Sequence, residues 1–153
     1  MLARIIFPLI SFAARRGFSD VRGDVQADAK QRARQTGVRG ETYAYWYLRR
    51  HGYVFVARNY TAPGIKGEID LVGYDGPVLA FVEVKTRTVR PDDPPLTKPE
   101  EAVTADKQLN LARMARQFLA EKGLYGTSCR FDVVAIESHV GARPVVRLHK
   151  AAF

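Results

Sequence analysis

The stretch GEIDLVGYDGPVLAFVEVKTR, residues Gly67–Arg87, decides the fold of this 153-residue chain. Two β-rich runs flank the pair Asp75-Gly76, and Asp-Gly between such runs is a strong signal for a β-hairpin. Strand residues alternate between two faces, and at least one face of a sheet is normally buried and apolar. Both runs nevertheless contain charged side chains, which are Glu68, Asp70, Glu83 and Lys85.

A two-residue turn at Asp75-Gly76 predicts how the two strands pair. It places Asp70 opposite Phe81, so that Asp70 and Glu83 are diagonal neighbours on one face, with Cβ atoms about 7 Å apart. The same register places Glu68 opposite Glu83, which is repulsive unless a cation intervenes. A slip of one residue would move the two carboxylates to opposite faces. The arrangement is therefore costly as plain structure and becomes favourable with a divalent metal.

The predicted cluster suits Mg²⁺ or Mn²⁺. Mg²⁺ prefers oxygen ligands and often uses one or two carboxylates together with substrate phosphate, as Asp70 and Glu83 would allow. Such an ion can polarise a phosphoryl oxygen and activate a water molecule. Lys85 shares a strand face with Glu83, where its ammonium can orient that water, help to deprotonate it, or stabilise developing negative charge. The pattern favours metal-assisted phosphodiester hydrolysis without a small-molecule cofactor.

Two predicted helices provide further candidates. GETYAYWYLRRHG predicts a helix that ends at Gly52 and carries Glu41 on its apolar face. Glu41 either favours the helix dipole or joins the metal ligands. A second helix is expected over Thr104–Lys122, with Lys107 on its core-facing side. The ammonium of Lys107 either reaches solvent or points at the scissile phosphate.

The rest of the chain completes a mixed α/β pattern. Further strands are expected at residues 53–60, 130–136 and 144–149, and a Pro-rich charged loop at 88–101. The order is then helix, three strands, helix and two strands. A mixed central sheet flanked by helices fits this order.

A strongly basic composition favours polyanionic partners. The formal net charge is +8 and the isoelectric point is near 9.9, which favours nucleic acid first and an anionic membrane surface second. The single Cys129 excludes an internal disulfide, and the spacing of the three histidines does not match a histidine metal site. Candidate phosphate contacts are Arg49, Arg50, Arg58, Arg87, Arg90, Lys98 and Arg113.

The N-terminal residues differ in composition from the rest. Residues 1–19 contain three arginines and no acidic residue, and their apolar run is too short to span a bilayer. We expect residues 1–36 to be a poorly packed extension or a targeting segment, with residues 19–37 as a solvated helix or a linker. The domain is expected over residues 37–153. The expected location is the cytoplasm, with export or membrane association through residues 1–19 as the alternative.

Asp70, followed by Glu83-Val84-Lys85, has the form of the PD-(D/E)XK nuclease signature across a β-hairpin. A fuller set resembles the YraN-like family of bacterial proteins, which are predicted endonucleases distantly similar to archaeal Holliday-junction resolvases. This set is GVRGE, HGYVFVARNY, GEIDLV, FVEVKTR, Lys107 and RFDVVAI, in that order. The resemblance covers roughly residues 37–136. Ile69 stands where the signature has proline.

The resemblance implies an α/β, restriction-endonuclease-like core with a metal-dependent nuclease site. It implies that Asp70 and Glu83 are metal ligands, that Lys85 is the catalytic lysine, and that Glu41 is the acidic residue contributed by a helix. Glu68 and Lys107 also match the family pattern, without an assigned role, and Arg87 is a supporting candidate.

The implied function is that of a Mg²⁺-dependent endonuclease acting on DNA, including branched or damaged DNA. The resemblance also implies a homodimer. The alternative is a nucleic-acid-binding protein with a weak or vestigial nuclease site, since fold analogy does not establish activity.

Overall fold

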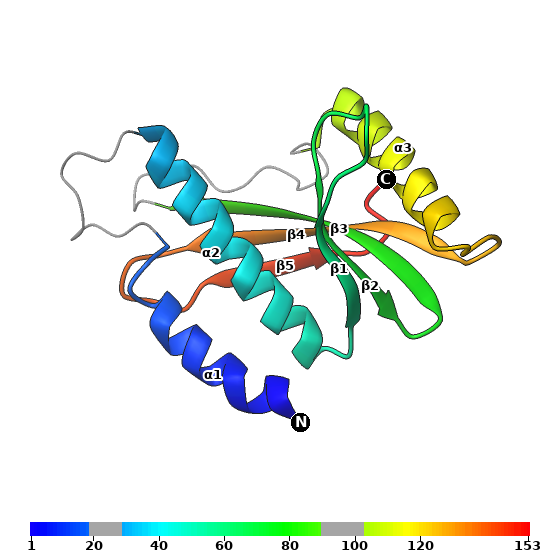
Figure 1. The fold of residues 1–153 in the computed structure, drawn as a ribbon. Coiled ribbons are helices and arrows are strands. Elements are labelled where there is room, and N and C mark those ends of the chain that lie inside the picture. The colour runs from blue at the N-terminus through cyan, green and yellow to red at the C-terminus, as the bar shows by residue number, and fades with distance from the viewer. Residues whose placement is uncertain (19–28, 90–102) are drawn as a thin grey trace. The chain divides into compact units, whose positions relative to one another are not determined.

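The computed structural model describes residues 1–18, 29–89 and 103–153. Its helices and strands follow one another along the chain as coloured in Figure 1. They are α1 (Leu2–Ala14), α2 (Ala29–Arg50), β1 (Val54–Tyr60), β2 (Ile69–Asp75), β3 (Val78–Thr88), α3 (Ala105–Glu121), β4 (Cys129–Ser138) and β5 (Val145–His149). The predicted order is confirmed from α2 onward. Two candidate phosphate contacts, Arg90 and Lys98, lie outside the described residues.

The five strands of the described residues form one sheet whose spatial order is the chain order. β1 pairs with β2 and β2 with β3, both antiparallel. Between β3 and β4, the amide of Leu79 donates to the carbonyl of Ser128, and that of Val89 donates to the carbonyl of Ser138. These two bonds join residues with the same sequence separation, which is the pattern of parallel strands. The predicted mixed sheet is confirmed.

The chain divides into two compact units. We call the first the α2 unit; it consists of Met1–His51, Val84–Pro95 and Val134–Arg147. We call the second the α3 unit; it consists of Gly52–Glu83, Leu96–Val133 and Leu148–Phe153. Strands β3, β4 and β5 contribute residues to both units.

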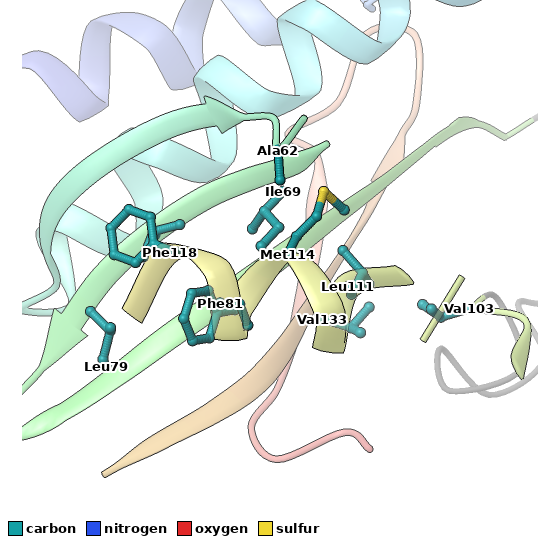
Figure 2. Packing of buried hydrophobic residues seen from close by; sticks show 11 residues of the cluster. Ala62, Ile69, Leu79, Phe81, Val103, Leu111, Met114, Phe118 and Val133 are labelled. Carbon is teal, nitrogen blue, oxygen red and sulfur yellow. The ribbon is translucent and has the colours of Figure 1, made fainter. Parts of the chain in front are cut away.

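The core of the α3 unit lies between α3 and the sheet (Figure 2). Thr104 caps α3 by accepting a hydrogen bond from the amide of Lys107. The helix buries Leu111, Met114 and Phe118, as its apolar spacing predicts. The Phe118 ring meets the Phe81 ring edge-on, with centroids 5.9 Å apart. Each such buried side chain contributes about 1.5–3 kcal/mol of hydrophobic stabilisation, which fixes α3 on the sheet.

In the α2 unit, α2 is longer than its apolar pattern predicted. It begins at Ala29, so the described part of the expected solvated helix or linker is helical. Gly40 lies against strand β3, where a Cβ atom would overlap Oγ1 of Thr86. The lack of a side chain at Gly40 therefore lets this helix approach the strand closely.

Residues 1–36 were expected to be a poorly packed extension or a targeting segment, and within them Leu2–Ala14 form a helix with one buried face. Within the α2 unit, α1 buries Ala3, Phe7, Ser11 and Ala14, which recur at helical spacing on one face. The Phe7 ring lies 5.4 Å from that of Tyr43 on α2. Composition suggested a targeting segment, but the spacing of these residues also suits packing against another helix. No helix in the described part of the chain is long and apolar enough to cross a membrane.

Candidate active site

The hairpin between β2 and β3 turns one position later than predicted. Asp75 pairs with Val78, so the two turn residues are Gly76 and Pro77 rather than Asp75 and Gly76. Gly76 has φ +59°, a value that glycine adopts without the strain of a side chain. Proline is held near φ −65°, and Gly followed by such a residue fits a type II′ turn. The chemistry of Gly76-Pro77 therefore sets the register.

This register changes which residues face each other but not which share a face. Leu71 is paired with Val82 and Val72 with Phe81. Asp70 and Glu83 each adjoin the last pair, Leu71 and Val82, so this register does not give them the predicted diagonal relationship.

The two carboxylates are buried. Asp70 is 7% exposed and Glu83 is 3% exposed. By strand alternation they lie on the same face as Val72 and Phe81, which belong to the core beneath α3. Two buried carboxylates on one face of a sheet repel each other unless positive charge lies nearby.

Helix α3 brings such a charge to the pair. The Nζ atom of Lys107 lies 2.5 Å from Oε1 of Glu83. The Lys107 side chain is 38% exposed, so its stem crosses from solvent to a buried partner. The sequence left two orientations open for Lys107, toward solvent or toward the scissile phosphate. Neither describes this contact fully, because the ammonium is bound to the carboxylate of Glu83.

A cavity of about 460 Å³ opens beside this ion pair in the α3 unit. It is lined by the loop before β2 and by the first turns of α3, including Glu68, Lys107, Lys66, Asp106 and Asn110. Glu68 precedes β2 and is exposed, so its predicted opposition to Glu83 is wrong. Glu68 and Lys107 instead line one cavity, together with the apolar side chains of Leu111 and Met114.

The remaining predicted site residues belong to the α2 unit. Glu41 lies in α2 and Lys85 in β3, and both are half-buried. Arg87 is bound within this unit: its guanidinium donates to Oε1 of Glu137 over 3.3 Å. Arg147 donates to the other carboxylate oxygen of Glu137, also over 3.3 Å. One nearly buried carboxylate thus orients two arginines.

The residues of the α3 unit fit a small divalent ion. Among residues 1–18, 29–89 and 103–153, no group of three or more acidic, histidine or cysteine side chains gathers to hold a metal. Asp70 and Glu83 provide a pair, and Mg²⁺ commonly uses one or two carboxylates, with waters and substrate phosphate completing its shell. Two buried carboxylates are the chemistry that such an ion stabilises.

Comparison with known proteins identifies the family. The model of a family described as "Uncharacterised protein family UPF0102" matches residues 40–136. The chain belongs to this family.

Individual UPF0102 proteins are similar over most of their length. A UPF0102 protein of Koribacter versatilis is 41% identical over 119 residues, which are 78% of this chain and 79% of that protein. One of Symbiobacterium thermophilum is 46% identical over 121 residues, which are 79% of this chain and 98% of that protein. The expected YraN-like, bacterial family is thereby confirmed at the level of UPF0102.

The UPF0102 match contains every predicted site residue. These residues are Glu41, Glu68, Asp70, Glu83, Lys85, Arg87 and Lys107. Helix α1 lies outside the matched range.

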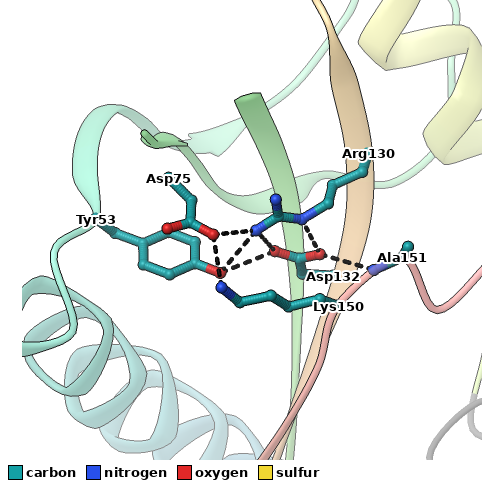
Figure 3. Close-up of polar contacts among 6 residues, drawn as sticks. All are labelled: Tyr53, Asp75, Arg130, Asp132, Lys150 and Ala151. Carbon is teal, nitrogen blue, oxygen red and sulfur yellow. Dashed lines mark hydrogen bonds and ion pairs between the residues drawn. The ribbon is translucent and has the colours of Figure 1, made fainter. Parts of the chain in front are cut away.

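The UPF0102 chain also has a polar network that the sequence did not reveal (Figure 3). Asp132 is fully buried and accepts hydrogen bonds from Tyr53, Arg130 and the backbone amide of Ala151. Arg130 also contacts Asp75 at the hairpin end, 2.5 Å away. The network joins the residue before β1, the hairpin, β4 and the C-terminal residues, so we assign it a structural role.

The charges of this network shift the protonation of its members. The hydrogen bond from Lys150, and then that from Arg130, hold the pKa of Asp75 below its ordinary value. Burial, and then the negative charge of Asp132, raise the pKa of Tyr53. The signal in the sequence was Arg130-Phe131-Asp132, since residues two apart share a strand face. Their partners are distant in sequence, and no local pattern indicates them.

Proposed function

We propose that this UPF0102 protein is a Mg²⁺-dependent endonuclease that hydrolyses DNA phosphodiester bonds. The observation that carries the proposal is the burial of two carboxylates, Asp70 and Glu83, next to the last pair of the β2–β3 ladder, with Lys107 bound to the second. Burying such a pair is costly, and structural ion pairs alone rarely repay that cost. A bound divalent ion would offset the cost of burying the two carboxylates, and it would also bind a substrate phosphate.

The resemblance to PD-(D/E)XK nucleases supports the same proposal. Asp70, Glu83 and Lys85 have the order and spacing of that signature across a hairpin. We propose membership in that superfamily, with a restriction-endonuclease-like core, from this motif together with the mixed sheet. The net charge of +8 supports a polyanionic substrate.

Each residue has a proposed role. Asp70 and Glu83 would hold the ion, which supplies Lewis-acid polarisation of the phosphoryl group when bound. Lys85 would orient the water whose oxygen forms the new bond to phosphorus as the bond to the leaving oxygen breaks. Lys107 fixes the orientation of Glu83. Glu41 is a candidate ligand through the family resemblance alone.

A second candidate function is nucleic-acid binding without cleavage. In the α2 unit, Tyr45 and Trp46 meet edge-on with centroids 5.2 Å apart. The Arg49 guanidinium lies 5.7 Å and 5.8 Å from the centroids of these two rings. Aromatic side chains interleaved with arginine can stack on unpaired bases and contact phosphates.

A nuclease assay separates the two candidates. The purified protein is incubated with branched, nicked and linear DNA in Mg²⁺, in Mn²⁺ and in EDTA. The variants Asp70→Asn and Glu83→Gln preserve side-chain shape and remove the charge that would bind the ion. Glu121→Gln, at an exposed position on α3, is the matched control.

We expect metal-dependent cleavage by the wild type and by the control, and loss of cleavage at least about a hundredfold in both site variants, with DNA binding retained. Binding without cleavage on every substrate would instead support the second candidate. The proposed place of action is the cytoplasm, and gel filtration of the same samples tests the predicted homodimer.

A further inference from the structure

Helix α1 has an exposed apolar stripe opposite the face that packs on α2. The stripe consists of Leu2, Ile5, Leu9 and Phe12, which are 57%, 62%, 68% and 64% exposed. Steps of three and four residues place all of them on one side of a helix. We refer to these four residues as the α1 stripe. Monomeric soluble proteins rarely expose contiguous apolar patches of this kind without a binding role.

The helix that carries the α1 stripe is held firmly on the α2 unit. On the buried face, Phe7 packs against Tyr43 and Tyr47, with ring centroids 5.4 Å and 6.0 Å apart. The Arg50 guanidinium lies over the Phe7 ring at 5.4 Å. At the C-terminal end, the carbonyl of Arg15 accepts a hydrogen bond from the amide of Gly141 over 2.8 Å. The α1 stripe is therefore presented outward by a fixed helix.

The charged side chains of residues 1–18, which include the helix that carries the α1 stripe, have one sign. Residues 1–18 contain Arg4, Arg15 and Arg16 and no acidic side chain. All three arginines are exposed. A second copy of this helix packed on the stripe would bring like charges together, whereas an anionic surface would be complementary.

The α2 unit also has a groove with apolar walls at the C-terminal end of α1. It has a volume of about 410 Å³ and lies between the C-terminal end of α1 and α2 within the α2 unit. Its lining includes the apolar residues Ile10, Phe18 and Val38, together with Arg16 and Arg39. The combination of apolar walls and arginines suits an anionic amphiphile.

We propose that α1 docks this protein onto an anionic phospholipid bilayer. The α1 stripe would enter the boundary between headgroups and acyl chains, and the arginines would contact lipid phosphates. A helix of 13 residues is about 20 Å long, and the hydrocarbon core of a bilayer is about 30 Å thick. The helix therefore lies along the surface and does not span it.

Sedimentation with lipid vesicles tests the proposal. The full chain is mixed with vesicles of phosphatidylcholine alone and with vesicles that also contain phosphatidylglycerol. One variant, Ile5→Ser/Leu9→Ser/Phe12→Ser, removes most of the α1 stripe; another, Arg4→Gln/Arg15→Gln/Arg16→Gln, removes its charge. Matched controls are Leu109→Ser/Val140→Ser and Arg113→Gln/Arg116→Gln/Lys122→Gln, all at exposed positions.

We expect the wild type and both controls to bind the anionic vesicles and not the neutral ones. The arginine variant should bind about a hundredfold more weakly, since each basic residue near an anionic surface contributes a factor of about five. The stripe variant should bind at least about tenfold more weakly, with an unchanged circular dichroism spectrum.

Failure of the wild type to bind anionic vesicles would overturn the proposal. So would a dimer in gel filtration that the stripe variant converts to monomer while vesicle binding persists, because the stripe would then be an interface between copies. Equal weakening by the control variants would show general electrostatic attraction and would likewise overturn the role of α1.

Discussion

The ammonium of Lys107 in the first turn of α3 lies 2.5 Å from the buried carboxylate of Glu83 on β3. This contact links the helix to the strand that carries the second half of the candidate site. It also supplies positive charge next to the end of the β2–β3 pairing, where Asp70 and Glu83 are both buried.

Replacing Lys107 by alanine should destabilise the protein. The change removes an ammonium from a carboxylate that is 3% exposed, and an abandoned buried charge is costly. Because the lysine side chain is 38% exposed and solvent screens it, we expect a loss of about 1–3 kcal/mol in the free energy of unfolding. Urea denaturation measures it. Lys122→Ala is the control, and an equal effect of both changes would contradict the assigned contact.

Mg²⁺ should stabilise the wild-type protein through its carboxylate pair. An ion that binds only the folded state adds about 2.7 kcal/mol when its concentration is a hundred times the dissociation constant. Thermal unfolding with increasing Mg²⁺ should show a rising midpoint that Asp70→Asn abolishes. Glu121→Gln should retain the rise. If Asp70→Asn responded to Mg²⁺ as the wild type does, the ion would bind elsewhere.

Two glycines of α2 should respond in opposite directions to alanine. A Cβ on Gly40 would overlap Oγ1 of Thr86, whereas one on Gly37 would meet nothing within 4 Å. Gly37→Ala should stabilise the helix by about 0.5–1 kcal/mol, because alanine has the higher helix propensity.

Gly40→Ala should instead lower the urea midpoint, since overpacking typically costs about 1–3 kcal/mol. Thr86→Ala removes the overlapping oxygen and should recover part of that loss. Equal stabilisation by the two alanine substitutions would refute the close approach of α2 and β3.

Acid should weaken the network around Asp75. Hydrogen bonds from Lys150 and Arg130 lower the pKa of this carboxyl from its ordinary value of 3.8. A group whose folded-state pKa is depressed contributes its stabilisation above the ordinary value and loses it as the pH falls toward the folded-state value. Stability should therefore decline below a pH of about 3.8. Asp75→Asn should flatten that decline, measured by urea denaturation across the acid range, and Asp106→Asn should leave it closer to wild type.

The hairpin shows how far the sequence predicts the site. Alternation fixes which side chains share a face. In the observed register each β2 residue faces a β3 residue two positions later than predicted. A shift of two residues preserves the faces, so Asp70 and Glu83 still share one. The turn itself was misplaced because Asp-Gly and Gly-Pro compete within three consecutive residues, Asp75-Gly76-Pro77. The positive φ of Gly76, followed by the restricted φ of proline, decides in favour of Gly-Pro.

Helices were harder to predict where their partners are distant. The sequence placed Lys107 on the core-facing side of α3, but the length of its side chain allowed either solvent or the site. Its contact with Glu83 depends on how closely α3 packs on the sheet, which follows from Leu111 and Phe118. The packing of helix α1 was not predicted for a related reason. Phe7 fits the composition of a targeting segment, and only its contact with the distant Tyr43 shows that it is buried.

Phe7 packs against Tyr43, which is only 3% exposed. Helix α1 therefore also determines how much apolar surface a shortened form of this protein would expose to solvent. Cutting the chain after Ala14 would uncover aromatic rings on α2 that lie inside the family-matched range. A version trimmed to residues 40–136 would keep the hairpin that carries Asp70 and Glu83. It would also expose an apolar, aggregation-prone surface on α2. Truncation experiments on this protein therefore report on colloidal behaviour as well as on chemistry.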